Sequence, residues 1–404
     1  MHFCIYTCLI KLNERYMKNR TGAPVDGNDF FGREKEIAYV WDLLQNGNNI
    51  LLPSPRRVGK SSFAKKMLEK AEGEGWEVIE INLERAHSEL EFVELLTGEL
   101  RKMSVWERSK ESGIKLLEII SALKPTLSIG GAEVKLDWKK EKSNIYRELE
   151  RILPHDREVL IFFDEVAVLL NGILLDSNGD KRQIEELMHW LRSLRQVSGS
   201  QIRWIFCSSV GIENFTTGHQ LSKTINDFSY YELKPFSSEA ATSMIIELEK
   251  GGNVTFNEEI RAQMLAKLGY LLPYFIQVLF EKMKGKIQIE DALIDQNLVN
   301  KAYNEIIEGA YLNTWDERLR EQYGDHKDDA YLLLRHICRA KEGMKRENLH
   351  NLLYQKYSDA DRTDSILATL LNMLQNDGYL AENNAHYLFR SPLIRDFWFN
   401  RFVK

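Results

Sequence analysis

Three consecutive residues, Gly59, Lys60 and Ser61, combine the groups that a phosphate-binding site needs. They stand between an apolar run, residues 50 to 53, and a segment whose apolar residues have helical spacing. At the start of a helix the backbone N–H groups point toward a bound anion, while a lysine reaches phosphate oxygens and a serine hydroxyl ligates Mg²⁺. The pattern predicts a phosphate-binding loop. Its members are Ser54, Arg56, Arg57, Val58, Gly59, Lys60, Ser61 and Ser62.

Ser54 stands five residues before Gly59, where glycine is expected. The turn at that place tends toward a conformation that is easiest for glycine, so serine replaces it at a cost. A Gly-Lys-Ser triplet also occurs by chance at ordinary helix starts, where the lysine is solvated. The flanking strand and helix favour the phosphate loop over that alternative.

A pair of acids, Asp164 and Glu165, follows the strongly apolar run Val159 to Phe163. Such a run belongs to a strand buried on both faces, and ligands bind at the carboxyl ends of such strands. Asp164 is suited to hold Mg²⁺, usually through water, and Glu165 is suited to orient and deprotonate an attacking water. The alternative is an acidic cap on the next helix.

Short apolar runs separated by helical patterns must position these residues. Their alternation predicts βαβ units and an α/β fold with a mostly parallel sheet. Between the second and third runs, the residues around Gly130-Gly131 predict a small β-hairpin, residues 127 to 136. The five runs are residues 50 to 53, 77 to 83, 158 to 163, 202 to 207 and 229 to 234.

The remainder of the chain has helical spacing from Ser237 to about Gly324, and then a different order of elements. Three helical segments, a hairpin turning at Asn383-Asn384 and a closing aromatic helix give a winged-helix-like order. A helix that reads DNA bases should carry Arg, Lys, Asn or Gln, but the third segment, residues 364 to 374, is almost wholly apolar. Protein contact or packing is therefore favoured over base reading.

Four parts are expected. They are an N-terminal extension, residues 1–20, a phosphate-loop domain, residues 21–236, a helical lid subdomain, residues 237–324, and a winged-helix-like domain, residues 325–404. A polar stretch begins at Met17, so we expect natural translation to start there. The alternative is that the first residues form a short strand or helix packed on the domain.

Several segments together resemble the archaeal-type ATPases of the STAND class, which are related to AAA+ proteins. The strongest are Asp29 to Glu36, the phosphate loop, and the Phe-Phe-Asp-Glu sequence that ends at Glu165. Further likenesses bring the covered range to about residues 20 to 400, with specific motifs in the ATPase half and weak ones beyond it. They are residues 191–196, 205–211, 225–227 and 269–274.

The resemblance implies roles for residues outside the loop. Phe31 and Gly32 would lie against an adenine, Pro273 and Tyr274 would close over the base, and Ser209 would sense the γ-phosphate. For Phe31 and Tyr274 the alternative is plain core packing. Family members usually have glycine where this chain has Ser54 and Ser208.

Arg192 and Arg195 lie three residues apart on one helical face, just before the fourth apolar run. At that place a trans-acting arginine finger could be presented to a neighbouring subunit, and we assign that catalytic role to Arg195. The alternative is a solvated helix face.

Composition limits the function classes. A net charge of −6 over 404 residues gives no global basic field for nucleic acid. The four cysteines, Cys4, Cys8, Cys207 and Cys338, form no CxxC pair, so neither a disulfide framework nor a zinc site is expected and a reducing cytoplasm fits best. The apolar run near the N-terminus is too short to span a bilayer.

The sequence therefore predicts a cytoplasmic molecular switch that binds ATP with Mg²⁺ and hydrolyses it slowly. Its partners would be ATP and a protein or a second copy of itself, with nucleic acid not favoured and no membrane. Two other classes stay open. One is a DNA-associated ATPase of the origin-recognition or transposition-helper kind, and the other is a nucleotide-dependent interaction scaffold without turnover.

Overall fold

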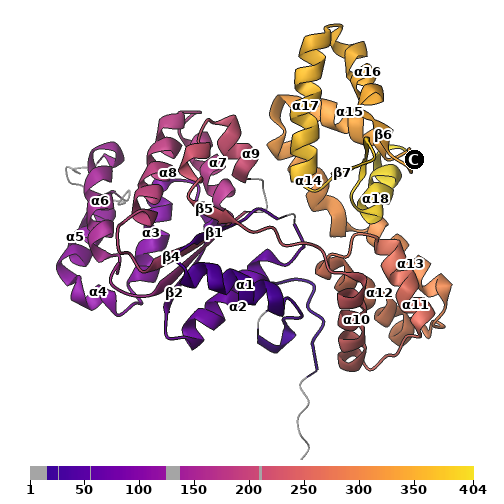
Figure 1. Cartoon of the computed structure of the whole chain (residues 1–404), viewed down its shortest axis with the longest axis horizontal. Coiled ribbons are helices and arrows are strands. Elements are labelled where there is room, and N and C mark those ends of the chain that lie inside the picture. The colour runs from indigo at the N-terminus through magenta and orange to yellow at the C-terminus, as the bar shows by residue number, and fades with distance from the viewer. Residues whose placement is uncertain (1–15, 26, 55, 124–136, 209–211) are drawn as a thin grey trace, which may run out of the picture.

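The computed structural model describes residues 16–25, 27–54, 56–123, 137–208 and 212–404 (Figure 1). The expected hairpin at residues 127 to 136 and Ser209 lie outside this part. Within it, Cys207 and Cys338 are buried free thiols. None of the helices described is both long enough and apolar enough to cross a membrane.

A five-stranded parallel sheet forms the centre of the N-terminal half (Figure 1). Its order is β2-β3-β4-β1-β5, and every neighbouring pair is parallel. Each strand overlaps one of the apolar runs, which confirms the α/β class and the parallel sheet. The strands are β1 Asn49–Leu52, β2 Glu77–Asn82, β3 Val159–Asp164, β4 Ile202–Cys207 and β5 Phe228–Tyr230.

Helices cover both faces of this sheet because successive side chains of a strand point to opposite faces. Leu160 and Phe162 of β3 pack in one core with α1 Glu34–Gln45 and α2 Lys60–Gly73, whereas Ile161 and Phe163 pack in the other. The helices of that second core are α3 Glu89–Leu100, α5 Lys110–Leu123, α6 Trp138–Ile152, α7 Val166–Asp176, α8 Lys181–Arg195 and α9 Ile212–Gly218. The short elements are α4 Val105–Arg108, η1 Gly27–Asp29, η2 Leu83–Arg85 and η3 Ser222–Thr224.

A helical lid follows the sheet and shares the core of α1 and α2. The term lid is used below for four helices, α10 Ser238–Gly252, α11 Glu258–Leu268, α12 Pro273–Glu290 and α13 Gln296–Glu308. Pro273 at the first position of α12 has a fixed φ that suits a helix start. The start of α12 is thereby well defined, and it faces the phosphate loop.

The C-terminal part combines helices with a small antiparallel sheet of order β6-β8-β7. The hairpin turns at Asn384 and Ala385, which both have positive φ, close to the expected Asn383-Asn384 turn. The elements are α14 Asn313–Gln322, α15 Lys327–Ile337, β6 Met344–Lys345, α16 Arg346–Tyr357, α17 Ala360–Asn376, β7 Leu380–Asn383, β8 His386–Phe389 and α18 Pro392–Phe402, with η4 Ala310–Leu312 and η5 Gly324–His326.

Helix α14 packs with this C-terminal part, although the expected boundary at residue 324 assigned it to the lid. The Tyr379 hydroxyl donates to the Trp315 carbonyl at 2.6 Å, and Arg401 lies 3.7 Å from Asp316. The C-terminal part, in the sense used below, therefore runs from α14 to α18.

Candidate functional site

A cavity of about 350 Å³ lies where the phosphate loop, the chain before α1 and the start of α12 meet. Its walls combine polar loop residues with apolar and aromatic side chains, an arrangement that suits a ligand with a charged end and an aromatic end. Eleven of the expected site residues line it. They are Phe31, Arg56, Arg57, Val58, Gly59, Lys60, Ser61, Ser62, Glu165, Pro273 and Tyr274.

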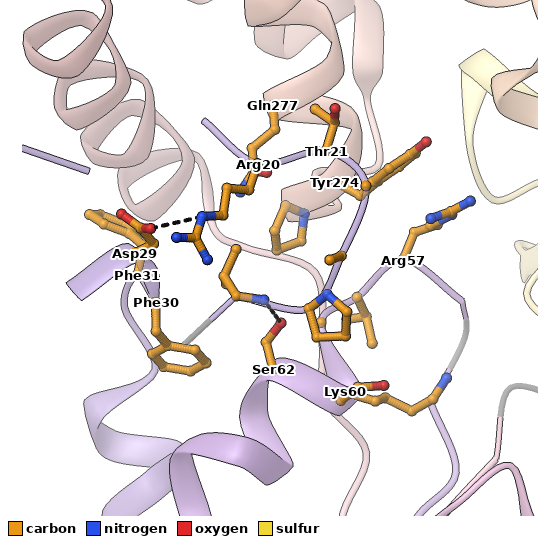
Figure 2. Close-up of a pocket in the computed structure, with 18 of the residues that line it drawn as sticks. Arg20, Thr21, Asp29, Phe30, Phe31, Arg57, Lys60, Ser62, Tyr274 and Gln277 are labelled. Atoms are coloured by element: carbon orange, nitrogen blue, oxygen red, sulfur yellow. Dashed lines mark hydrogen bonds and ion pairs between the residues drawn. The ribbon is translucent and has the colours of Figure 1, made fainter. Parts of the chain in front are cut away.

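The loop obtains its shape from two left-handed residues, Arg57 with φ 70° and Gly59 with φ 95°. For a non-glycine residue this conformation costs roughly 1–2 kcal/mol. The Arg57 guanidinium lies 3.9 Å from the centre of the Tyr274 ring, a cation–π contact that joins the loop to α12. Figure 2 shows these two side chains on the same side of the cavity.

Lys60 begins α2 and is buried, and its ammonium donates to the Ser54 carbonyl oxygen. Burial lowers the pKa of Lys60, while the nearby charge of Glu165 acts in the opposite direction. A buried ammonium is stabilised by an anion close to it. Lys60 is therefore placed to hold phosphate oxygens.

Ser61 and Asp164 meet at the end of β3. The Ser61 hydroxyl donates to Asp164 Oδ2 at 2.7 Å, and Asp164 Oδ1 accepts from the Glu165 N–H at 3.0 Å. Hard cations such as Mg²⁺ prefer oxygen ligands of this kind. Cys207 of β4 is buried nearby, where burial and then the charge of Asp164 raise the pKa of its thiol, so the thiol stays neutral.

Ser54 corrects one expectation. Its φ is not positive, so the position does not need glycine, and the left-handed places of the loop are Arg57 and Gly59 instead. The Ser54 hydroxyl accepts a hydrogen bond from the Leu233 N–H at 2.7 Å. The serine thus ties the loop to the chain that follows β5.

Phe31 and Gly32 lie in the turn before α1. Phe31 lines the cavity and also packs edge-on against Phe236, with ring centroids 6.2 Å apart, so lining and core packing are combined. Gly32 has φ 66°, a conformation that favours glycine. It shapes the turn before α1 without lining the cavity.

Arg195 corrects a second expectation. Its side chain is fully buried, with Nε 2.8 Å from Asp227 Oδ2 and Nη2 donating to the Thr224 carbonyl at 2.6 Å. The guanidinium also lies over the Phe228 ring, 4.3 Å from its centre. A buried, paired arginine cannot reach a neighbouring subunit, so Arg195 holds α8 to the loop before β5. Arg192 lies 4.0 Å from the same Asp227.

Arg33 is a site residue that the sequence reasoning missed. It is buried with φ 69° at the N-terminal cap of α1, and its Nη2 donates to the Val58 carbonyl at 3.0 Å and to the Lys234 carbonyl at 2.9 Å. One guanidinium thus joins the phosphate loop to the segment after β5. The only signal in the sequence was its place in the Phe-Gly-Arg-Glu segment.

The segment of residues 16–25, called the strap below, was also missed. Met17 and residues 20–25 line the cavity, although the sequence analysis assigned residues 1–20 to an extension. Asn19 donates to the Gln277 carbonyl at 3.1 Å on the lid, and the Val25 N–H donates to Ser62 Oγ at 3.0 Å on α2. Figure 2 shows the strap crossing between these helices. Arg20 Nε lies 3.1 Å from Asp29 Oδ2.

The family comparison supports a nucleotide site. Residues 30–261, more than half of the chain, match the model of a family described as an ATPase domain predominantly from Archaea. A search of the curated proteins finds no match.

Two solved structures share the fold along nearly the whole chain. The Walker-type ATPase PABY2304 of Pyrococcus abyssi has a TM-score of 0.61 at 17% identity, over 96% of this chain and 99% of that one. The ORC2 protein of Aeropyrum pernix, solved as ADPNP-ADP complexes, has a TM-score of 0.56 at 14% identity, over 95% and 98%. Identities this low show the fold alone.

The family match and the loop geometry lead to the same conclusion. A lysine at the start of a helix, a loop before it with two left-handed residues, and two acids at the end of a buried strand are features that suit ATP hydrolysis. The chain is an ATPase, and it belongs to the family whose ATPase domain is found predominantly in archaea.

Proposed function

We propose that the chain is a molecular switch of the STAND class, which binds ATP with Mg²⁺ in the 350 Å³ cavity and hydrolyses it slowly. The observation that carries this proposal is the 2.7 Å contact of Ser61 Oγ with Asp164 Oδ2. Two oxygens from different elements meet beside the lysine of the loop. Ser61 and Asp164 would hold a Mg²⁺ ion, which would offset the charge of the ATP phosphates.

The residues around this pair have separate roles in the proposal. Lys60 holds the β and γ phosphate oxygens, and Glu165 orients the attacking water and takes its proton. Phe31 lies against the adenine, while Pro273 and Tyr274 cover it from the lid. Ser209, which follows β4 in the sequence, senses the γ-phosphate.

Several elements of the chain line the same cavity, and this supports a switch rather than a metabolic catalyst. The strap, the phosphate loop and the lid all contribute to it. A ligand that touches several elements favours their joint arrangement by its differential affinity. A protein client or a second copy of the chain would read that arrangement.

The proposed mechanism is tested by ATP turnover and nucleotide binding of the purified chain. Lys60→Ala should lose ATP binding, whereas Glu165→Gln should bind ATP and lose turnover by about 100-fold or more. Lys102→Ala is the control, because this exposed lysine does not line the cavity. Turnover that survives both site substitutions would eliminate the mechanism.

The client is sought with the Glu165→Gln variant, which should hold the ATP state. A pull-down with this variant in Mg-ATP should retain a protein that the Lys60→Ala variant does not retain. Equal retention by both variants would show that the contact does not depend on nucleotide.

A DNA-associated ATPase is the second candidate, and it rests on the helix-helix-helix-hairpin order of α15, α16, α17 and β7-β8, which we interpret as a winged helix. The exposed face of α17 has Arg362 but also the acids Asp361 and Asp364, so its charge does not favour DNA phosphates. DNA binding should fall steeply with salt if this candidate holds. Duplex DNA that shows no nucleotide-dependent binding at low salt would remove it.

A further inference from the structure

A second cavity, of about 370 Å³, lies between the carboxyl edge of the large sheet and the C-terminal part. Ser54 and Ser208 line it where β1 and β4 end, and Arg318 of α14 lines it from the C-terminal part. The Ser54 carbonyl accepts the hydrogen bond of the Lys60 ammonium. The second cavity is thus directly beside the place where the phosphate loop holds its lysine.

Arg318 is anchored within the C-terminal part. Its side chain is 2% exposed, and Nη2 donates at 2.6 Å to Asp377, which follows α17. Asp377 also accepts from the Tyr323 hydroxyl at 2.9 Å. A guanidinium has five N–H donors in a planar fork, so an arginine that holds a carboxylate on one edge can bind a phosphate oxygen on another.

Positive charge converges between the two cavities. Burial, and after it the charge of Arg318, lower the pKa of Arg56 in the phosphate loop. An anion placed between two such guanidinium groups would stabilise both of them.

Ser208 gives an independent indication of a ligand at the same place. It is 3% exposed, and its Oγ is a buried atom without a hydrogen-bond partner among the residues described. Buried hydroxyls normally have a partner. A phosphate oxygen that extends from the loop toward this cavity would supply one.

We propose that Arg318 binds the terminal phosphate of ATP within the same chain, so that the C-terminal part distinguishes bound ATP from bound ADP. The inference rests on the ATP site proposed above. Glu213 and Glu232 also line the second cavity and repel an anion near them, so the phosphate lies at the end formed by Ser54 and Ser208. With ADP, Arg318 keeps Asp377 as its anionic partner.

The test compares affinities of the full chain for Mg-ADP and for a non-hydrolysable ATP analogue with Mg²⁺. Arg318→Met keeps most of the apolar stem and removes the charge. This variant should bind the ATP analogue about tenfold more weakly or worse, whereas its affinity for ADP should change by less than about twofold. A loss of this size is expected for one charge-assisted hydrogen bond. Arg320→Met is the control, because Arg320 is on the same helix with its side chain 55% exposed.

A second variant separates this role from a structural one. Asp377→Asn weakens the competing partner of Arg318, so the preference for the analogue over ADP should rise about threefold or more. If Arg318 only holds α14 to α17, both variants lower the melting temperature and neither changes the ratio of the two affinities. An unchanged ratio in either variant overturns the inference, whereas a wild-type chain that binds neither nucleotide overturns the proposed function.

Discussion

Arg33 shows how one side chain can hold two distant backbone segments together beside the cavity. Its guanidinium reaches carbonyls 25 and 201 residues away in the sequence, at Val58 and Lys234. Both acceptors are backbone groups, so the contact fixes the course of the chain rather than the position of another side chain. A planar fork can satisfy two acceptors at once, which the single ammonium of a lysine does less well.

Arg33→Met should lower the free energy of unfolding by about 1.5–3 kcal/mol, the usual value of a hydrogen bond to a charged group. ATP affinity should fall as well, because the Val58 carbonyl loses the donor that fixes the loop. Denaturant unfolding and nucleotide titration measure the two effects. Lys35→Met, an exposed position on the same helix, should stay within about 0.5 kcal/mol of the wild type. Equal stability of the two variants would contradict this role.

The burial of Lys60 leads to a prediction of how ATP affinity depends on pH. Burial lowers the pKa of Lys60 from 10.5 in the unliganded chain, and bound phosphates would raise it again. Below the lowered pKa the lysine is charged before ATP arrives, so affinity is independent of this group. Above it, binding must take up a proton, and affinity should fall by up to about tenfold per pH unit.

This decline should begin at a pH below 10.5 and is measured by nucleotide titration at alkaline pH. Melting of the unliganded chain at each pH serves as the control for loss of the fold. An affinity that stays constant until the chain itself unfolds would show that Lys60 does not contribute charge to binding.

The strap connects helices that are distant in the sequence. Asn19 bonds to α12 and Val25 bonds to α2, while Met17 is buried against Gly251 at the end of α10. A Cβ built on Gly251 would lie 2.2 Å from the Met17 carbonyl oxygen. The close approach of strap and helix therefore requires glycine at this position.

Gly251→Ala should displace the strap, so residues 16–25 should become more sensitive to protease and ATP affinity should fall several-fold. Gly285→Ala is a matched control on α12, because a Cβ there meets nothing within 4 Å. In a helix interior that control should be neutral or stabilising by about 0.5–1 kcal/mol. Equal protease patterns for both variants would show that the strap does not depend on this contact.

The sequence predicted those features of the molecule that depend on neighbouring residues. Each buried strand is a local apolar run, and the loop with Lys60 and Ser61 lies between one such run and a helix. The place of Asp164 at the carboxyl edge of the sheet could be predicted because it directly follows a local apolar run.

Features that depend on distant parts of the chain were not predictable in the same way. Arg195 has the spacing of an exposed arginine, and only the approach of Asp227 from another loop accounts for its burial. The strap meets α12 through a contact between residues 258 positions apart. Arg318 shares a cavity with Ser54 because α14 packs with the C-terminal part rather than with the lid.

Bound ATP should contact the phosphate loop and the lid at the same time, so both parts should respond to it together. Tyr274 of the lid contacts Arg57 of the loop, 3.9 Å from ring centre to guanidinium, and both line the same cavity, so a nucleotide in that cavity would touch both parts. Mg-ATP should therefore protect amides from hydrogen exchange across residues 265–280 together with those of the phosphate loop. The junction near Pro235 would act as the hinge.

Hydrogen exchange of the unliganded chain and of the chain with Mg-ATP provides the measurement. The Lys60→Ala variant is the control, since it should lose protection in both segments if one ligand protects them. Protection confined to residues 54–62 and 160–165 would mean that the N-terminal domain binds nucleotide alone. In that case the lid would not move with the nucleotide state. The proposed contact of Arg318, which does not involve α12, would then be the route by which the C-terminal part responds to ATP.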